Sequence, residues 1–374
     1  MDRNPRSIRR LAVVLAAVGL GLRAALLPVA CTALKSGDDR PPPSGDGAAD
    51  DGEEGGGEAG ASACPAITEF SLPGDAGKYP SGIVEGPDGN LWFTLQFTVA
   101  YVPGREGAYG NAMGWMSPDG TPHELAVPTP SAGPYAMTLG PDHNPWFTEF
   151  GSGNVGRVTI DAGPVVTEFS TPASAPNGIS PGPDGSVWFT DFNGNNVDWI
   201  ADDGGSVNQL PIPHASGQPR GITLGPDGNV WFGEQAGLVG RVTPGGQFQE
   251  FAVETGNPSV GDIVVGSDGN LWFTDGGNQA IGRITTEGVI TEYAIPTSGS
   301  NPFAIAAGPD GALWFTETST NKIGRLTVAA TGNASFLECP VPTPKSNPLA
   351  IVVTSSAVWF TESFVNKIGR IALP

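Results

Sequence analysis

The chain has 374 residues, of which 55 are Gly and 36 are Pro, yet nine tryptophans and 39% hydrophobic residues are too much apolar surface for a disordered polymer. Thirty-eight acidic and eighteen basic residues give a net charge of −20, which argues against a nucleic-acid partner, because such partners are bound through Lys and Arg. Three cysteines and no CxxC motif argue against a disulfide scaffold or a structural zinc site.

Residues 1–30 have the pattern of an export signal. Four arginines in the first ten residues precede an apolar stretch over 11–30, as in a secretory signal peptide. Arg23 and Pro28 argue against a membrane span, although the stretch is long enough for one. Cys31 follows small residues, so a lipoprotein-type signal with lipidation at Cys31 and ordinary cleavage near Ala33 both remain open. We expect an extracytoplasmic protein that is either secreted or held at the membrane only through a lipid anchor.

Residues 31–63 form an acidic, Gly/Pro-rich region. Between 36 and 63 there are eight acids, one Arg and no large apolar residue. Such a segment cannot bury enough surface to offset its ordering entropy. We therefore expect a disordered tether between the signal and a folded domain over 64–374.

A repeat organises residues 64–374. Seven Trp-Phe pairs begin at Trp92, Trp146, Trp188, Trp231, Trp272, Trp314 and Trp359. Their spacing is near 42 residues, except for 54 between the first two. A period of this length with short strand-like runs indicates a β-propeller with one four-stranded blade per repeat. The fold class predicted is all-β, a seven-bladed β-propeller.

The fourth repeat shows the expected blade. Strand A is predicted at 220–225, strand B at 229–234, strand C at 238–243 and strand D at 248–253, with a Pro-Asp-Gly turn between A and B. The last repeat ends after its strand C, over 367–373, and the missing strand D matches 66–72. We therefore predict that the N-terminal strand closes the last blade. Cys64 precedes this strand and Cys339 lies in strand D of blade 6, and whether they pair in an oxidising compartment remains open.

Two further residue types recur in the blades. Strand C carries Gly-Arg in five blades, while Trp115 and Trp199 take the place of the Arg in the other two. Strand B ends in an acid in six blades, namely Glu149, Asp191, Glu234, Asp275, Glu317 and Glu362. Because strands B and C form a hairpin, we predict cross-strand ion pairs between these acids and the arginines. A structural role is favoured over a metal-binding or catalytic ring, since the acid recurs in nearly every blade.

Three repeated units also carry a family resemblance. They are Gly-Pro-Asp-Gly-Asn-Leu-Trp-Phe-Thr at 86–94, Asn-Lys-Ile-Gly-Arg at 321–325 and Ile-Thr-Glu-Tyr-Ala-Ile-Pro-Thr at 290–297. The chain resembles the streptogramin (virginiamycin B) lyases, which are seven-bladed propellers, over all of 64–374. The resemblance implies a metal-assisted carbon–oxygen elimination that opens the ester of a cyclic depsipeptide antibiotic. It also implies a His general base and a second His after the Pro that starts strand A in the last two blades, with a carboxylate helping to hold Mg²⁺.

Strand A of every blade begins at the mouth of the central channel. Counting back from each Trp places one residue per blade in a ring there: Ser81, Tyr135, Asn177, Arg220, Gly261, Phe303 and Leu349. Phe303 and Leu349 stand where the resemblance implies the two histidines, and Asn347 stands where it implies an acid. Glu362 and Ser363 are the candidates for the other carboxylate. Phe and Leu cannot accept a proton, so no catalytic residue is assigned, and Asn347 and Glu362 are the weak metal candidates.

The three histidines lie elsewhere in the sequence. His123 and His143 are expected on the solvated surface. His214 lies in a connection between strands D and A that we expect to reach the channel face, so it is a candidate ligand-binding residue.

A lactonase-type propeller would hold a metal with channel carboxylates and Asn, and here only Asp262 and Asn177 come near that pattern.

Three functions are compatible with these residues. The first is a binding propeller in which Tyr135, Asn177, Arg220, Asp262, Phe303, Leu349 and His214 surround a small molecule or glycan at the channel mouth. The alternatives are an active lyase of this family, which would need Mg²⁺ and opens an ester or lactone, and a non-catalytic cell-surface scaffold. The first is our preferred interpretation, with the protein a monomer. The insertion in blade 1, Gln96–Asn111, is expected to mark the functional edge.

Overall fold

The computed structural model describes residues 64–73, 78–97, 111–161 and 163–373. The chain divides into two units, Met1–Ala59 and Gly60–Pro374, and all described residues belong to the second. The expected signal peptide with Cys31, the tether and residues 98–110 of the blade 1 insertion lie outside the described residues. Within the described part of the chain, no helix is long and apolar enough to cross a membrane.

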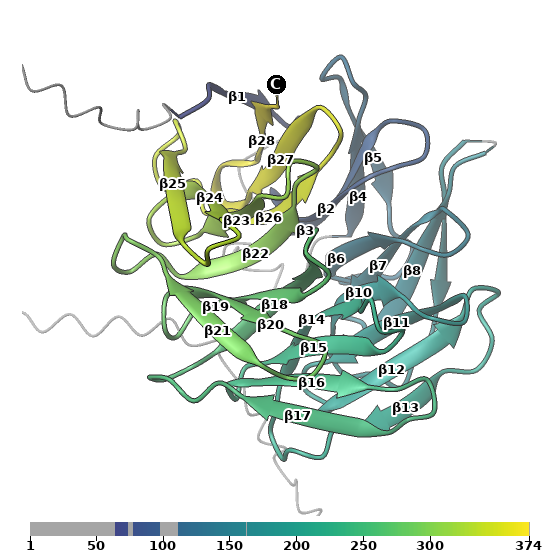
Figure 1. The fold of residues 1–374 in the computed structure, drawn as a ribbon. Coiled ribbons are helices and arrows are strands. Elements are labelled where there is room, and N and C mark those ends of the chain that lie inside the picture. Colours follow the sequence, from purple (N-terminus) through teal and green to yellow (C-terminus); the bar gives the residue numbers. More distant parts are fainter. Residues whose placement is uncertain (1–63, 74–77, 98–110, 162, 374) are drawn as a thin grey trace, which may run out of the picture. The chain divides into compact units, whose positions relative to one another are not determined.

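The described residues form seven four-stranded antiparallel sheets around a common axis (Figure 1). In each sheet the order from the axis outward is strand A, B, C and D. Blade 1 holds β2 (Lys78–Glu85), β3 (Leu91–Phe97), β4 (Ala112–Met116) and β5 (Pro122–Ala126). Blade 2 holds β6 (Pro134–Leu139), β7 (Pro145–Glu149), β8 (Asn154–Thr159) and β9 (Val165–Phe169). Blade 3 holds β10 (Pro176–Pro181), β11 (Ser186–Asp191), β12 (Asn196–Ala201) and β13 (Asn208–Pro211).

The remaining four blades repeat the arrangement. Blade 4 holds β14 (Pro219–Leu224), β15 (Val230–Glu234), β16 (Leu238–Val242) and β17 (Phe248–Ala252), within a residue of the expected bounds. Blade 5 holds β18 (Val260–Val265), β19 (Leu271–Asp275), β20 (Ala280–Ile284) and β21 (Ile290–Ala294). Blade 6 holds β22 (Pro302–Ala307), β23 (Leu313–Glu317), β24 (Lys322–Val328) and β25 (Ala334–Pro340). Blade 7 holds β26 (Pro348–Val353), β27 (Ala357–Glu362) and β28 (Lys367–Ala372), with the short 3₁₀ turn η1 (Ser363–Val365) before β28.

The N-terminal strand closes the last blade, as predicted. Strand β1 (Ile67–Ser71) pairs antiparallel with β28, from Ile67 opposite Ile371 to Ser71 opposite Lys367. The sheet therefore runs β1-β28-β27-β26 from the outside inward. Glu69 fastens this strand further, because it accepts hydrogen bonds from the backbone N and the hydroxyl of Thr343 and from Lys367.

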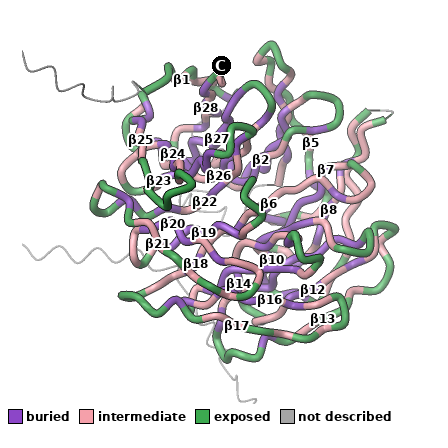
Figure 2. The backbone as a smooth tube through the Cα atoms, viewed as in Figure 1, coloured by how far each residue is buried: buried purple, intermediate pink, exposed green. Residues whose placement is uncertain are grey.

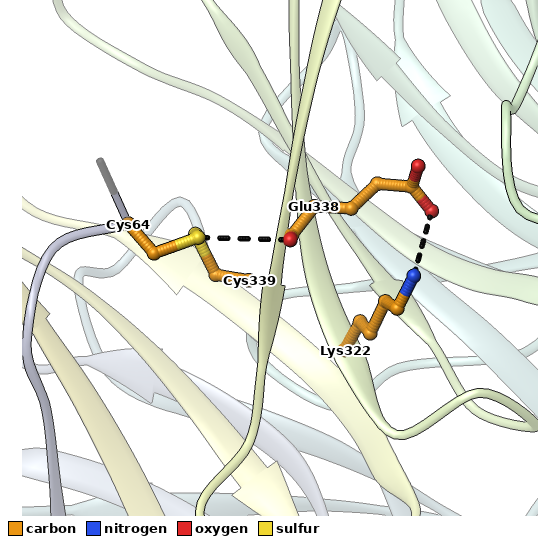
Figure 3. The surroundings of a disulfide bond; sticks show 4 residues. All are labelled: Cys64, Lys322, Glu338 and Cys339. Carbon is orange, nitrogen blue, oxygen red and sulfur yellow. Dashed lines mark hydrogen bonds and ion pairs between the residues drawn. A yellow bond between two sulfur atoms is a disulfide. The ribbon is translucent and has the colours of Figure 1, made fainter. Parts of the chain in front are cut away.

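A disulfide holds the segment that leads into β1. Cys64 and Cys339 are bonded, with their Cα atoms 5.4 Å apart (Figure 3). Cys339 is buried in β25, next to Glu338, which forms an ion pair with Lys322 across 3.3 Å. The bond thus joins the start of the folded domain to the outer strand of blade 6.

The hydrophobic core lies between the blades rather than inside any one of them. Seven clusters of buried side chains are present, and each combines residues of two neighbouring blades. The Trp of one blade packs against the Phe of the next, as Trp231 does with Phe273. Figure 2 shows the burial concentrated along the inner and middle strands. Each such aromatic side chain buries roughly 150–250 Å².

The Gly-Arg motif of strand C supports this packing. In blade 4 the ring of Phe232 lies over Gly240, where a Cβ would come within 2.1 Å of the ring. Gly240 therefore cannot be replaced without moving the Phe. The neighbouring Arg241 stacks on Trp231, 5.2 Å from the ring centroid, and forms an ion pair with Asp227 of the Pro-Asp-Gly turn.

The predicted ion pairs between these arginines and the acids that end strand B are wrong. The register places Arg241 opposite Trp231, whereas Glu234 lies opposite Leu238. Trp231 and Glu234 are three residues apart and so point to opposite faces of the sheet. Where Trp replaces the Arg the stack is kept, since Trp115 lies on Trp92 and Trp199 lies on Trp188.

Candidate functional site

Each innermost strand carries a β-bulge close to its start. In β14 the register with β15 shifts between Pro219 and Ile222, so Arg220 and Gly221 have no regular partner. The same shift follows the first residues of the innermost strand in all seven blades. A bulge bends the strand and re-aims its side chains. One ring residue per blade is thereby directed at the axis.

These strands enclose a central cavity of about 160 Å³. All seven residues that the sequence placed in the ring line it, as the count back from each Trp predicted: Ser81, Tyr135, Asn177, Arg220, Gly261, Phe303 and Leu349. Asp262 lines it as well, together with apolar side chains that include Met137, Ile179 and Ile351. Among the residues nearest the axis, the polar side chains therefore come from blades 1 to 5 and the apolar side chains of Phe303 and Leu349 come from blades 6 and 7.

A set of buried threonines fixes the backbone around this cavity. Thr190 accepts a hydrogen bond from the N–H of Gly178 in its own blade, at 2.9 Å, and donates to the carbonyl of Arg220 in the next blade, at 2.6 Å. Equivalent pairs of bonds are made by Thr94, Thr148, Thr274, Thr316 and Thr361. The Thr of the Trp-Phe-Thr unit thus links the innermost strand of its own blade to the ring residue of the next blade.

Blade 4 breaks this series. Gly233 takes the place of the Thr, and a Cβ there would come within 2.5 Å of the carbonyl oxygen of Gly261. Blades 4 and 5 therefore approach each other more closely than a Thr would allow. This junction separates Arg220 from Asp262 along the ring.

Arg220 is held on the polar side of the cavity. Its Nε and Nη2 donate to Oε1 of Gln235, at 3.3 and 2.7 Å, and its guanidinium lies 5.4 Å from the centre of the Phe192 ring. Burial lowers the pKa of the guanidinium, and the nearby Tyr135 opposes that effect. Arg remains charged even so, because a guanidinium is not deprotonated in proteins.

Tyr135 and Asp262 complete the polar side. Burial raises the pKa of Tyr135, with Arg220 acting to lower it and Asp262 to raise it, so the phenol keeps its proton at neutral pH. Burial also raises the pKa of Asp262 to about 6, although its oxygens accept the backbone N–H groups of Ile263 and Ile305 at 3.0 and 3.1 Å. Asp262 therefore changes charge just below neutral pH.

A second set of residues near the cavity was not predicted from the sequence. Phe150, Phe192 and Gln235 each follow the acid that ends strand B, and they contact Tyr135 or Arg220. Phe364 in η1, at the related position of blade 7, does not line the cavity; it lies edge-on to Tyr79, with ring centroids 6.1 Å apart, and is 62% exposed. The signal that could have located these residues is their position, one or two residues beyond the strand B acid.

The residues on the apolar side do not fit a magnesium site. Phe303 and Leu349 offer no oxygen or nitrogen ligand. Asn347 lies outside the cavity lining and adopts a left-handed conformation, φ 56°, with its carbonyl accepting the N–H of Ser363. Glu362 is fully buried, and burial, with Glu69 adding to it, raises its pKa to about 7. Among the residues that the structure describes, no group of three His, Cys, Asp or Glu could hold a metal ion.

His214 does not reach the cavity, contrary to the expectation for its loop. It is exposed and absent from the lining, and its backbone N–H donates to Glu250 at 3.0 Å. Thr129 and Thr343 make the same contact with Glu168 and Glu69 in other blades. His214 therefore occupies the position that Thr129 and Thr343 occupy in the connections of other blades, outside the cavity lining.

The other two histidines are also on the surface, as expected. His143 is exposed in the turn between β6 and β7, and exposed His123 stacks on Trp115 with ring centroids 4.9 Å apart. No His is found among the described residues that line the cavity.

The acids that end strand B are buried under the connections between strands D and A. Asp191 accepts hydrogen bonds from the N–H groups of Ser174, Ala175 and Gly194. Glu149 and Glu317 accept side-chain hydrogen bonds, whereas both oxygens of Glu234 have no hydrogen-bond partner in the described part of the chain. None of these acids lines the cavity.

The fold and the cavity define a class of protein, a seven-bladed β-propeller with a small cavity on its axis. The profile of the Virginiamycin B lyase family matches residues 105–260 and 234–374. Virginiamycin B lyase from Staphylococcus aureus is 35% identical, with a TM-score of 0.73, over 83% of this chain and 99% of that one. A catalytically inactive histidine-to-alanine variant of the S. aureus enzyme, determined with quinupristin, is 34% identical with a TM-score of 0.74, over 83% of this chain and 99% of that one.

A further relative is virginiamycin B lyase from Nocardia farcinica (strain IFM 10152). It is 35% identical over 89 residues, a match that spans 24% of this chain and only 26% of that protein. The profile and the solved structures cover most of the propeller. The chain therefore belongs to the virginiamycin B lyase family.

Proposed function

We propose that this family member binds a small ligand in the central cavity and does not catalyse streptogramin-type elimination. One observation carries the proposal. Phe303 and Leu349 stand on the cavity wall at the positions to which the resemblance assigns the two histidines. Neither side chain can take a proton, and a positioned base contributes about 10²–10⁴-fold to a rate. Without the base and the metal ligands, most of the acceleration is lost.

Retained binding is supported by the composition of the cavity. Ligand sites combine apolar walls with a few placed polar groups, and here Phe303 and Leu349 face the same space as Tyr135, Asn177 and Arg220. A scaffold without a ligand would not need an arginine fastened by Gln235 and Phe192 beside that space. The ligand class proposed is a small molecule, with a glycan as an alternative.

We also propose that the protein works outside the cytoplasm as a monomer. Residues 1–30 have the pattern of an export signal, with a lipid anchor at Cys31 as one of its two outcomes. The disulfide between Cys64 and Cys339 supports this location, because such bonds persist in oxidising compartments.

Ligand-observed NMR with a library of small charged and neutral fragments tests the binding site. We expect a set of fragments that compete with one another for the purified protein. Leu349→Trp fills the cavity from its wall and should abolish their binding. Val289→Trp is the matched control, because Val289 is 62% exposed on an outer loop. Fragment binding that survives Leu349→Trp, or no binding by any fragment, would overturn the proposed site.

A further inference from the structure

We propose that the ligand of the central cavity is a small organic monoanion, a carboxylate with an apolar body of about one ring, bound by Arg220. The inference rests on the proposed function and specifies the ligand class of the same cavity. It follows from the charge of Arg220, from the way its guanidinium is held, and from the size and the apolar wall of the cavity.

Arg220 is a partly buried cation with no carboxylate partner among the residues that the structure describes. The ion pairs of the described residues all involve other arginines and lysines. Its described hydrogen bonds go to one neutral acceptor, Oε1 of Gln235. A charge that is partly withdrawn from water without a counter-ion carries a desolvation cost. An anionic ligand would supply the missing charge.

Asp262 lines the same cavity and still does not act as that counter-ion. Its oxygens accept the N–H groups of Ile263 and Ile305, on strands β18 and β22, so the carboxylate is engaged with the wall. The remaining negative charge of Asp262 would repel an anion that carries two charges. A monoanion is therefore favoured over a phosphate or a dicarboxylate.

The guanidinium is oriented in advance for a carboxylate. Arg has five N–H donors in a planar fork. Gln235 accepts from Nε and Nη2, and Phe192 supports the guanidinium at 5.4 Å, which leaves Nη1 and the second N–H of Nη2 for a ligand. Because the guanidinium is already fixed in place, it loses little conformational entropy when it binds a carboxylate through two hydrogen bonds. Tyr135 keeps its proton and lines the same cavity, so its hydroxyl is a further donor.

The volume of the cavity and its apolar wall set the size of the ligand. Phe303, Leu349 and Ile351 line the cavity, whose volume is about 160 Å³. A protein cavity of about 150 Å³ lined by apolar side chains accommodates one benzene ring. Benzoate and similar monocyclic or branched aliphatic acids therefore match both the charge and the apolar space.

Isothermal titration calorimetry at pH 6.5 with benzoate and its neutral analogue benzamide tests the inference. We expect benzoate to bind the purified protein roughly tenfold to a hundredfold more tightly than benzamide, as for a charged hydrogen-bonded pair. Arg220→Gln should remove this preference, and Arg220→Lys should keep part of it because the charge remains. Arg241→Gln, on the outer part of the same blade, should leave it unchanged.

The outcomes separate the ligand class from the site. If benzoate and benzamide bind equally and Leu349→Trp abolishes the binding of both, the ligand is not required to be an anion. The inference would then be overturned, while the proposed function stands. A benzoate preference that survives in folded Arg220→Gln would also overturn it. If neither these compounds nor any library fragment binds, the proposed function fails and the inference fails with it.

Discussion

Replacing Glu234 by Gln should stabilise this propeller at neutral pH. Glu234 is fully buried at the end of β15, both of its oxygens lack a hydrogen-bond partner among the described residues, and a Cβ on Gly217 would come within 2.1 Å of Oε2. Asp191 occupies the same place in blade 3, where Ser174 donates to it through its backbone N–H and its hydroxyl. In blade 4 the place of Ser174 is taken by Gly217, which has no hydroxyl. Glu234 therefore lacks the hydrogen-bond donor that would favour its ionised form.

The size of the effect follows from the pKa of Glu234. Burial, with Glu250 adding to it, raises this pKa from 4.5 to about 8. At pH 7 the carboxyl is therefore protonated in the folded protein and ionised in the unfolded chain. The folded protein is therefore stabilised by keeping this carboxyl protonated. That stability is fully present below pH 4.5 and is lost as the pH rises through 8, where the buried carboxyl ionises. Gln carries no titrating proton, so Glu234→Gln should gain about 2 kcal/mol at pH 7 once solvent screening is allowed for.

Urea unfolding at pH 5, 6, 7 and 8 measures this effect as a difference between the variant and the parent protein. We expect a stability difference near zero at pH 5 that grows steadily to pH 8. Glu85→Gln is the control, because it makes the same replacement at an exposed position. The reasoning is refuted if Glu234→Gln is less stable than the parent at pH 8, or if its effect does not change with pH.

Three further predictions follow from the closure, the threonine links and the cavity. Deleting residues 64–73 should sharply lower the melting temperature measured by circular dichroism, because β1 completes blade 7, whereas deleting 36–60 should not; equal melting would contradict the closure. Thr190→Val should cost about 1–3 kcal/mol in urea unfolding, since it leaves the N–H of Gly178 and the carbonyl of Arg220 without their partner; an unchanged midpoint would contradict this role. Benzoate affinity should rise between pH 7.5 and 5.5, as Asp262, whose pKa burial raises to about 6, takes up a proton and loses its repulsion; calorimetry on Asp262→Asn should show no such rise.

Much of the fold could be predicted because the repeat fixes it. The seven Trp-Phe units determine the number of blades, and the missing strand D of the last repeat determines the closure by β1. The ring of cavity residues was also predictable, since each lies a near-constant distance before its Trp and the bulge recurs in every blade. Both features depend only on spacing along the chain.

The contacts of the side chains were less predictable. The predicted pairing of Arg241 with an acid is wrong because the alternation of a strand places Trp231, not Glu234, on its face of the hairpin. Phe192 and Gln235 were missed because their approach to Arg220 depends on how the turns after strand B bend over the axis. His214 was misplaced because the length of its loop does not tell which of its residues point inward.

The most direct test of the account is an assay for the family's own reaction. The purified protein is incubated with a type B streptogramin and Mg²⁺, beside the S. aureus virginiamycin B lyase, and the ring-opened product is measured by mass spectrometry. With Phe303 and Leu349 on the cavity wall, the account predicts no product above the rate without protein. Turnover comparable to that of the S. aureus enzyme would contradict it.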